Sequence, residues 1–134
     1  MVRAFGERVG RAEAGHGYWA VRDDCEAAVL GIGGILPKTI EGIPVFNLYY
    51  RFAPEAWGRG YAAETAIAAI DLAAEQQSRP VVAICREANV PSRRVAERVG
   101  MTLAGTVLHS GSPCLVYESP KLPSFSALRQ AGAD

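Results

Sequence analysis

Residues 57–63 read Trp-Gly-Arg-Gly-Tyr-Ala-Ala and join a strand-like run to a long alanine-rich stretch. A glycine-containing turn that opens a helix leaves several backbone N–H groups unpaired at the helix start. The positive end of the helix dipole lies at the same point, so such a turn can bind a phosphate or pyrophosphate. The types and spacing of these residues therefore indicate a phosphate-binding loop.

Two other interpretations of this loop remain open. Residues 58–63 also fit the Gly-x-Gly-x-x-Ala pattern of dinucleotide-binding folds. Such folds carry an acidic residue about 20 positions further on, at the end of the next strand. The nearest acid here is Glu87, which comes later than that. The loop would alternatively be a plain helix-opening turn that binds no ligand.

The elements that position the loop follow from the spacing of apolar residues. We expect helices over residues 2–14 and 61–77 and a helix that follows Asn89, and strands over 17–22, 26–34, 44–52, 81–86, 101–109 and 113–119. The prolines of residues 35–43 and 120–134 predict a loop and a weakly ordered C-terminal tail. The chain is thus expected to be an α/β (α+β) protein with one domain over residues 1–119, built on a mixed, mostly antiparallel sheet flanked by helices.

Composition narrows the classes of function. Among 134 residues, 14 basic side chains balance 14 acidic ones, which gives no support for nucleic-acid binding through bulk charge. No apolar run approaches the ~18–20 residues that span a bilayer, so we expect a soluble, cytoplasmic protein with no membrane partner. Cys25, Cys85 and Cys114 lack paired spacing, and His16 and His109 have no partner at metal-ligand spacing. We therefore expect no disulfide framework and no metal.

Three segments in a fixed order resemble the Gcn5-related N-acetyltransferase family. The first, residues 47–66, resembles the family's acetyl-CoA pyrophosphate loop, Arg/Gln-x-x-Gly-x-Gly/Ala. Its six positions are occupied by Trp57, Gly58, Arg59, Gly60, Tyr61 and Ala62. Tryptophan at the first position is typical of the branch that resembles ribosomal-protein N-terminal acetyltransferases. The second segment, residues 89–101, resembles the family's Asn-x-x-Ser…Gly-Phe segment, with Met101 in place of the aromatic residue, and the third is the closing hairpin.

This resemblance implies acetyl-CoA as donor and a GNAT-like acyltransferase fold. The amides of residues 58–62 would face the pyrophosphate, and Gly58 and Gly60 would let the backbone approach it closely. Arg59 would add a charge-assisted contact, or would be a solvated side chain. Backbone groups of Phe52 and Ala53 would pair with the pantetheine arm, and one N–H would hold the thioester carbonyl.

The helix after Asn89 would supply two further contacts. Asn89 would hydrogen-bond the pantetheine arm, or would only cap the helix, since asparagine is a preferred capping residue. Ser92 would stabilise the departing thiolate of CoA, or would only bond the backbone of the first turn.

No general base can be assigned from the sequence. Family members often carry a glutamate on the strand that enters the cofactor site, but the matching residue here is Asn47. Tyr49 and Tyr50 flank the site and titrate too high, and a water relay to His16 or a carboxylate has no direct support.

The resemblance implies that the family's first strand and helices, which normally come first, are missing before Gly17. We therefore expect a shortened domain with its cofactor half intact, and an exposed sheet edge that would favour a homodimer. The expected function is transfer of an acetyl group from acetyl-CoA to a primary amine, either a protein N-terminus or a small molecule. The alternative is a non-catalytic acyl-CoA-binding module of the same fold.

Overall fold

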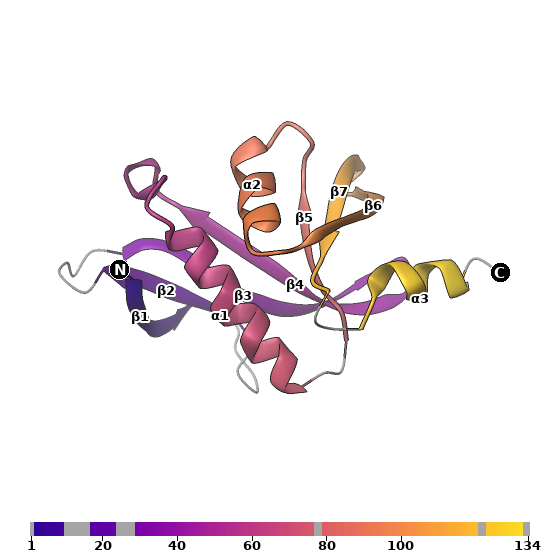
Figure 1. Cartoon of the computed structure of the whole chain (residues 1–134), viewed down its shortest axis with the longest axis horizontal. Coiled ribbons are helices and arrows are strands. Elements are labelled where there is room, and N and C mark those ends of the chain that lie inside the picture. The colour runs from indigo at the N-terminus through magenta and orange to yellow at the C-terminus, as the bar shows by residue number, and fades with distance from the viewer. Residues whose placement is uncertain (1, 10–16, 24–28, 77–78, 121–122, 133–134) are drawn as a thin grey trace.

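The computed structural model describes residues 2–9, 17–23, 29–76, 79–120 and 123–132 (Figure 1). The strands are β1 (Val2–Val9), β2 (Gly17–Asp23), β3 (Val29–Ile40), β4 (Ile43–Phe52), β5 (Val81–Cys85), β6 (Thr102–His109) and β7 (Ser112–Glu118). The helices are η1 (Pro54–Ala56), α1 (Tyr61–Gln76), α2 (Val90–Arg98) and α3 (Phe125–Gly132). No helix among the described residues is long and apolar enough to cross a membrane.

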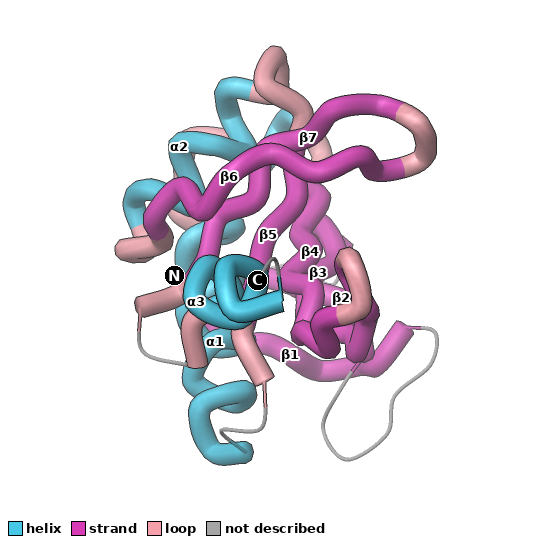
Figure 2. Tube along the Cα trace, turned by 90° about the vertical axis from the view of Figure 1, so that its right-hand side faces the viewer, coloured by secondary structure: helices cyan, strands magenta, loops and turns pink. Residues whose placement is uncertain are grey.

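The strands form one seven-stranded sheet in the order β1-β2-β3-β4-β5-β7-β6. Every neighbouring pair is antiparallel except β4 and β5, which run parallel. Figure 2 shows α1 and α2 together on one side of this sheet. The expected mixed, mostly antiparallel sheet with flanking helices is therefore confirmed.

The alanine-rich face of α1 lets this helix lie close to the sheet. Ala66, Ala69 and Ala73 are fully buried and belong to a core cluster that also contains Phe46 and Leu48 of β4. Gly33 of β3 lies directly below the helix, because a Cβ added there would stand 2.5 Å from the Thr65 Cγ2. Small residues on the helix and on β3 therefore fix how closely α1 lies on β3 and β4.

Strand β4 changes partners along its length, and this change shapes the site. It pairs with β3 from Ile43 to Phe52, but its parallel pairing with β5 covers only Phe46 and Asn47. Beyond Asn47 the two strands diverge, as Figure 1 shows between β4 and β5. The sheet thus splits on the side where β4 runs into η1.

The predicted loop over residues 35–43 is wrong for most of its length. Strand β3 continues to Ile40 and turns through Glu41 and Gly42, which both have positive φ, 51° and 81°. Such a two-residue turn matches the twist of a hairpin. Pro37 pairs with Phe46, and Pro44 pairs with Thr39. Both pairs are non-hydrogen-bonded positions of the β3–β4 ladder, so the N–H that proline lacks is not needed there.

The predicted helix near the N-terminus is also wrong. Residues 2–9 form β1, which pairs with β2 from Val2↔Asp23 to Val9↔Tyr18, and the remainder of that prediction lies outside the described residues. Ladder pairing with a neighbouring strand has overridden a weak helical spacing. The edge of β2 that we expected to be exposed is paired with β1, so the first strand is not missing, and β1 forms this end of the sheet instead. The homodimer stays a prediction.

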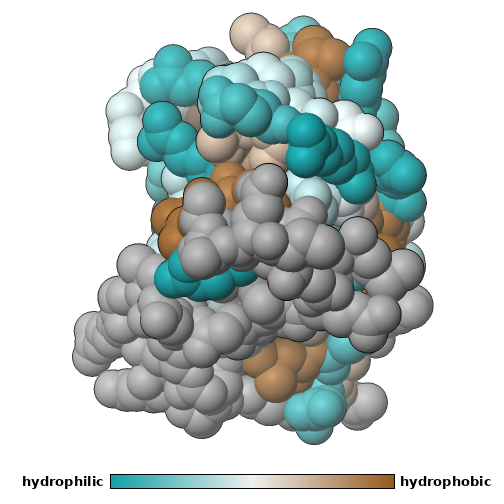
Figure 3. Space-filling view, turned by 90° about the vertical axis from the view of Figure 1, so that its left-hand side faces the viewer, coloured by the Kyte–Doolittle hydropathy of each residue, from teal (hydrophilic) through white to brown (hydrophobic). Residues whose placement is uncertain are grey.

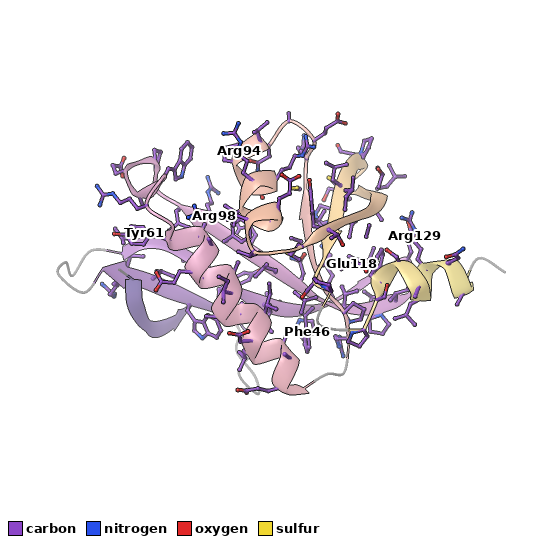
Figure 4. The ribbon with its side chains drawn as sticks, viewed as in Figure 1. Phe46, Tyr61, Arg94, Arg98, Glu118 and Arg129 are labelled. Atoms are coloured by element: carbon purple, nitrogen blue, oxygen red, sulfur yellow. The ribbon has the colours of Figure 1, made fainter. Side chains whose placement is uncertain are left out.

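The C-terminal segment forms a helix instead of a weakly ordered tail. Phe125 is fully buried against Val45, Val82 and Val116, on the sheet face opposite α1. The Glu118 carboxylate accepts hydrogen bonds from the Ser126 N–H and Oγ at 2.9 and 2.7 Å and from the Ser124 Oγ at 3.0 Å. A carboxylate at this end of α3 complements the helix dipole (Figure 4).

Candidate functional site

A cavity of about 930 Å³ lies where β4 leaves β5. Its walls come from the end of β4, the loop before α1, the first turn of α1 and the cavity-facing side of α2. The predicted site residues that line it are Phe52, Ala53, Trp57, Gly58, Gly60, Tyr61, Ala62, Asn89 and Ser92. Arg59 is exposed and is not part of this lining. The structure therefore brings together residues that are 40 positions apart in the sequence.

The loop before α1 requires its two glycines for conformational reasons. Gly58 and Gly60 have φ values of 79° and 84°, a region that residues with a Cβ rarely adopt. A Cβ at either position would meet no atom within 4 Å, so strain and not crowding selects glycine. The same open space leaves the backbone accessible, and α1 begins directly after Gly60 with the Glu64 N–H bonded to the Gly60 carbonyl at 3.0 Å.

Trp57 ties this loop to the end of β4. Its indole Nε1–H donates to the Phe52 carbonyl at 2.9 Å, while 60% of the residue is exposed. The sequence motif predicted a ligand-binding position for Trp57 and gave no sign of this structural bond. The indole fixes the distance between the strand end and the glycines.

A small apolar cluster holds the other side of the loop. The rings of Phe52 and Tyr61 stack with their centroids 6.4 Å apart, and both pack with Ala56. Tyr61 is only 5% exposed, so its side chain acts as an anchor for the first turn of α1. The backbone N–H groups at this helix start are thus held beside the cavity.

The backbone of β4 presents its groups alternately to β3 and to the split. Phe46 donates its N–H to the Pro80 carbonyl on the β5 side, and alternation places the N–H groups of Tyr50 and Phe52 on that same side. The Ala53 N–H instead donates to the Leu30 carbonyl at 2.9 Å. The expectation for Ala53 is corrected in this respect, because its N–H is committed to a residue beside β3.

Helix α2 begins with a capping contact at the cavity wall. The Asn89 Oδ1 accepts from the Ser92 N–H at 3.3 Å, so the capping role is present in the structure. Pro91 occupies the first turn, where its missing N–H costs no hydrogen bond. Asn89 also lines the cavity, so capping does not remove it from the site.

A pair of hydroxyl groups joins β4 to α2 across the site. The Tyr50 hydroxyl donates to the Ser92 carbonyl at 2.8 Å, and the Ser92 Oγ donates to the Tyr50 hydroxyl at 3.4 Å. Burial raises the pKa of Tyr50 to about 12, although its hydrogen bond with Ser92 opposes the rise. Tyr50 therefore stays neutral near pH 7 and cannot act there as a base.

Cys85 stands next to this pair at the end of β5. Burial raises the pKa of the Cys85 thiol, and hydrogen bonding to Ser92 opposes that rise. The thiol is therefore protonated near pH 7 and is a poor nucleophile.

The charged side chains among the described lining residues are Arg51, Arg94 and Arg98. Asn47 does not line the cavity, and its Oδ1 is buried without a hydrogen-bond partner among the described residues. His16 lies outside the described residues. The described part of the cavity thus combines an exposed glycine turn, hydroxyl groups and arginines, which suits an extended ligand that carries phosphate groups.

Known proteins are similar to this chain in sequence and fold. The Acetyltransferase (GNAT) domain family matches residues 2–102. The uncharacterized protein YkkB of Bacillus subtilis (strain 168) is 38% identical over 111 residues, which are 81% of this chain and 64% of that protein. The crystal structure of an acetyltransferase from Agrobacterium tumefaciens str. C58 is 32% identical, with a TM-score of 0.66 over 78% of this chain and 60% of that one.

A more distant structure contains a ligand. The putative acetyltransferase yncA from Salmonella typhimurium, solved with its cofactor acetyl-CoA, is 16% identical with a TM-score of 0.63, over 78% of this chain and 64% of that one. At this identity the likeness shows the fold alone.

The cavity at the split of the sheet, beside the glycine turn, is consistent with this family match. The chain belongs to the GNAT acetyltransferase family, so the predicted family is confirmed. It spans 64% of the length of YkkB.

Proposed function

We propose that this chain binds acetyl-CoA in the cavity between β4 and α2 and transfers the acetyl group to a primary amine. The acceptor would be a protein N-terminus or a small molecule. The observation that carries the proposal is the cavity itself, which runs from the split between β4 and β5 to the glycine turn at the start of α1. Its volume of about 930 Å³ is within the range of cofactor sites, and a neighbour of the same fold is known with acetyl-CoA.

The pyrophosphate would lie against the backbone of residues 58–62. Gly58 and Gly60 leave open space over their main chain, and the dipole of α1 favours a negative charge at this end. Arg59 would reach the phosphates only from the solvent side, because it does not line the cavity.

The pantetheine arm would take the place of the absent strand partner of β4. The N–H groups of Tyr50 and Phe52 face the split, and an extended chain there can accept hydrogen bonds as an added strand does. A backbone N–H beside the thioester carbonyl would stabilise the negative charge that develops on its oxygen. Phe52 is held in place by the Trp57 bond to its carbonyl and by the stack of its ring on Tyr61.

The transfer itself would be direct. The lone pair of the neutral amine attacks the thioester carbonyl carbon, the C–S bond breaks and its electron pair leaves on sulfur. The proton that the nitrogen loses passes through water to this thiolate, so that CoA leaves as the thiol. Ser92 would turn its hydroxyl from Tyr50 toward the sulfur and stabilise the thiolate with a hydrogen bond. The long 3.4 Å contact that Ser92 would give up is weak, so this rotation costs little.

Two observations favour the alternative, a non-catalytic acyl-CoA-binding module. Asn47 stands where a glutamate base is expected, and the pKa of about 12 removes Tyr50 from that role. If the chain does catalyse transfer, no residue named above deprotonates the acceptor, so the acceptor has to arrive as the free amine. An N-terminal amine has a lower pKa than lysine and meets this condition more easily.

Calorimetry and a thiol-release assay test these readings. We expect acetyl-CoA to bind and NAD to show no binding, and we expect acetyl-CoA to release thiol with at least one member of a panel of N-terminal peptides and small amines. Tight CoA binding without turnover on any amine would favour the module. Binding of NAD without binding of CoA would refute both.

We also propose the cytoplasm as the compartment. Cys85 and Cys114 are buried free thiols, which fits a reducing environment.

A further inference from the structure

Two arginines of α2 face the same cavity as the glycine loop. Arg94 and Arg98 are one helical turn apart, both are exposed, and both line the cavity. In Figure 4 they project from α2 on the side of the molecule where α1 begins at Tyr61. Figure 3 shows hydrophilic side chains over the upper part of the face on this side, at the height that α2 has in Figure 1. The cavity therefore has a cationic wall opposite its glycine wall.

The two guanidinium groups have no contact in the described part of the chain that would hold them in place. Among the described residues, neither Arg94 nor Arg98 makes a hydrogen bond or an ion pair. Arg93, their neighbour on the same helix, differs, because it donates to the Tyr117 hydroxyl at 3.3 Å and to the Glu87 carbonyl at 3.0 Å. Two adjacent arginines beside a cavity, with all their donors available, match the geometry of a phosphate ligand.

If the proposed function holds, the phosphates of CoA fall into two groups. The pyrophosphate has two phosphorus atoms and fits the backbone N–H groups at the start of α1. The third phosphate is a monoester on the 3′ position of the ribose, carries more negative charge, and lies on a different part of the nucleotide. It needs its own donors, and the glycine loop is already matched to the pyrophosphate.

We propose that Arg94 and Arg98 bind the 3′-phosphate of CoA and make the chain select CoA over dephospho-CoA. The glycine loop then supplies affinity for any CoA-like pyrophosphate, whereas α2 supplies selectivity for the third phosphate. The inference rests on the proposed function, since it assigns a part of the same ligand.

The test compares CoA with dephospho-CoA by calorimetry on the whole chain. We expect the wild-type chain to bind CoA at least about tenfold more tightly, as two charge-assisted contacts to a phosphate would give. The variant Arg94→Gln/Arg98→Gln should bind dephospho-CoA as before and should lose most of the preference for CoA. Arg86→Gln is the matched control, because Arg86 is exposed, lies just before α2 and is outside the cavity lining, so its preference should equal that of wild type.

Each other result has a distinct meaning. Equal wild-type affinity for the two nucleotides overturns the inference and leaves the proposed function intact. A preference that survives the double variant, or an equal loss for both nucleotides, overturns the assignment to these arginines. A wild-type chain that binds neither nucleotide refutes the proposed function as well. The melting temperature of the variants checks folding, and the single variants Arg94→Gln and Arg98→Gln serve if the double variant is unstable.

Discussion

Ser92→Ala should separate turnover from cofactor binding. The Ser92 main chain makes the contacts that hold the start of α2, since its N–H bonds the Asn89 Oδ1 and its carbonyl accepts from Tyr50. Alanine keeps both, and it removes an Oγ that donates to the Tyr50 hydroxyl at a long 3.4 Å and also hydrogen-bonds the Cys85 thiol. Stability and acetyl-CoA affinity should therefore change by less than about 1 kcal/mol.

The loss in rate should be larger. A hydrogen bond to a charged group contributes about 1.5–3 kcal/mol, and the thiolate is charged only as the C–S bond breaks. Turnover should then fall about 10- to 100-fold, since each 1.36 kcal/mol of barrier is a factor of about ten. Thiol release at saturating amine measures kcat, and calorimetry measures the Kd for acetyl-CoA.

Two variants control this experiment. Ser112→Ala makes the same chemical change at the β6–β7 turn, outside the cavity lining, and should leave both quantities unchanged. Ser92→Thr keeps the hydroxyl and should restore part of the rate. Unchanged turnover in Ser92→Ala, or a loss of rate matched by an equal loss of affinity, would refute the assigned role.

Three further predictions concern the elements around the site. Gly60→Ala should destabilise the chain by about 1–2 kcal/mol, because φ is 84° there, and should also weaken CoA binding. Gly111→Ala, at φ 79°, should cost similar stability and leave CoA binding unchanged. Thermal melts measure the stability of both variants and calorimetry measures their affinity for CoA; an equal loss of affinity in the two variants would contradict a special role for Gly60. Gly33→Ala should lower the free energy of unfolding in urea by about 1–3 kcal/mol, because its Cβ would stand 2.5 Å from the Thr65 Cγ2; an unchanged midpoint would show that α1 can move. Burial raises the pKa of Tyr50 to about 12, so the neutral hydroxyl stabilises the folded chain fully below pH 10, and about 2–3 kcal/mol of the free energy of unfolding is lost as the pH rises to 12. Tyr50→Phe should lose less stability over this pH range. Parallel alkaline unfolding curves for the two chains would count against the shift.

The sequence predicted the local parts of the site well. Gly58 and Gly60 have the positive φ that a strained turn demands, and Asn89 with Pro91 marks the start of α2. Such signals depend on a few neighbouring residues, so they can be recognised without tertiary contacts. The alanines of α1 likewise predicted close packing.

Features that depend on distant partners were missed. The strand at residues 2–9 exists through its ladder with β2, and α3 is held by Phe125 and by the Glu118 carboxylate. No motif in the sequence singled out Arg94 and Arg98. Only the folded chain shows that this face of α2 lines the cavity.

The split between β4 and β5 connects fold to function most directly. Phe46 and Asn47 are paired on both sides, whereas Tyr50 and Phe52 have a strand on one side only. Unpaired backbone groups are costly when they are removed from water, so they either stay hydrated or take a ligand. Trp57 fixes the loop to the end of β4 through its bond to the Phe52 carbonyl, and Tyr50 fixes the spacing between β4 and α2 through its bonds to Ser92. A ligand that completes the β4 ladder thus enters a gap that the fold already maintains, and little ordering free energy has to be spent when it binds.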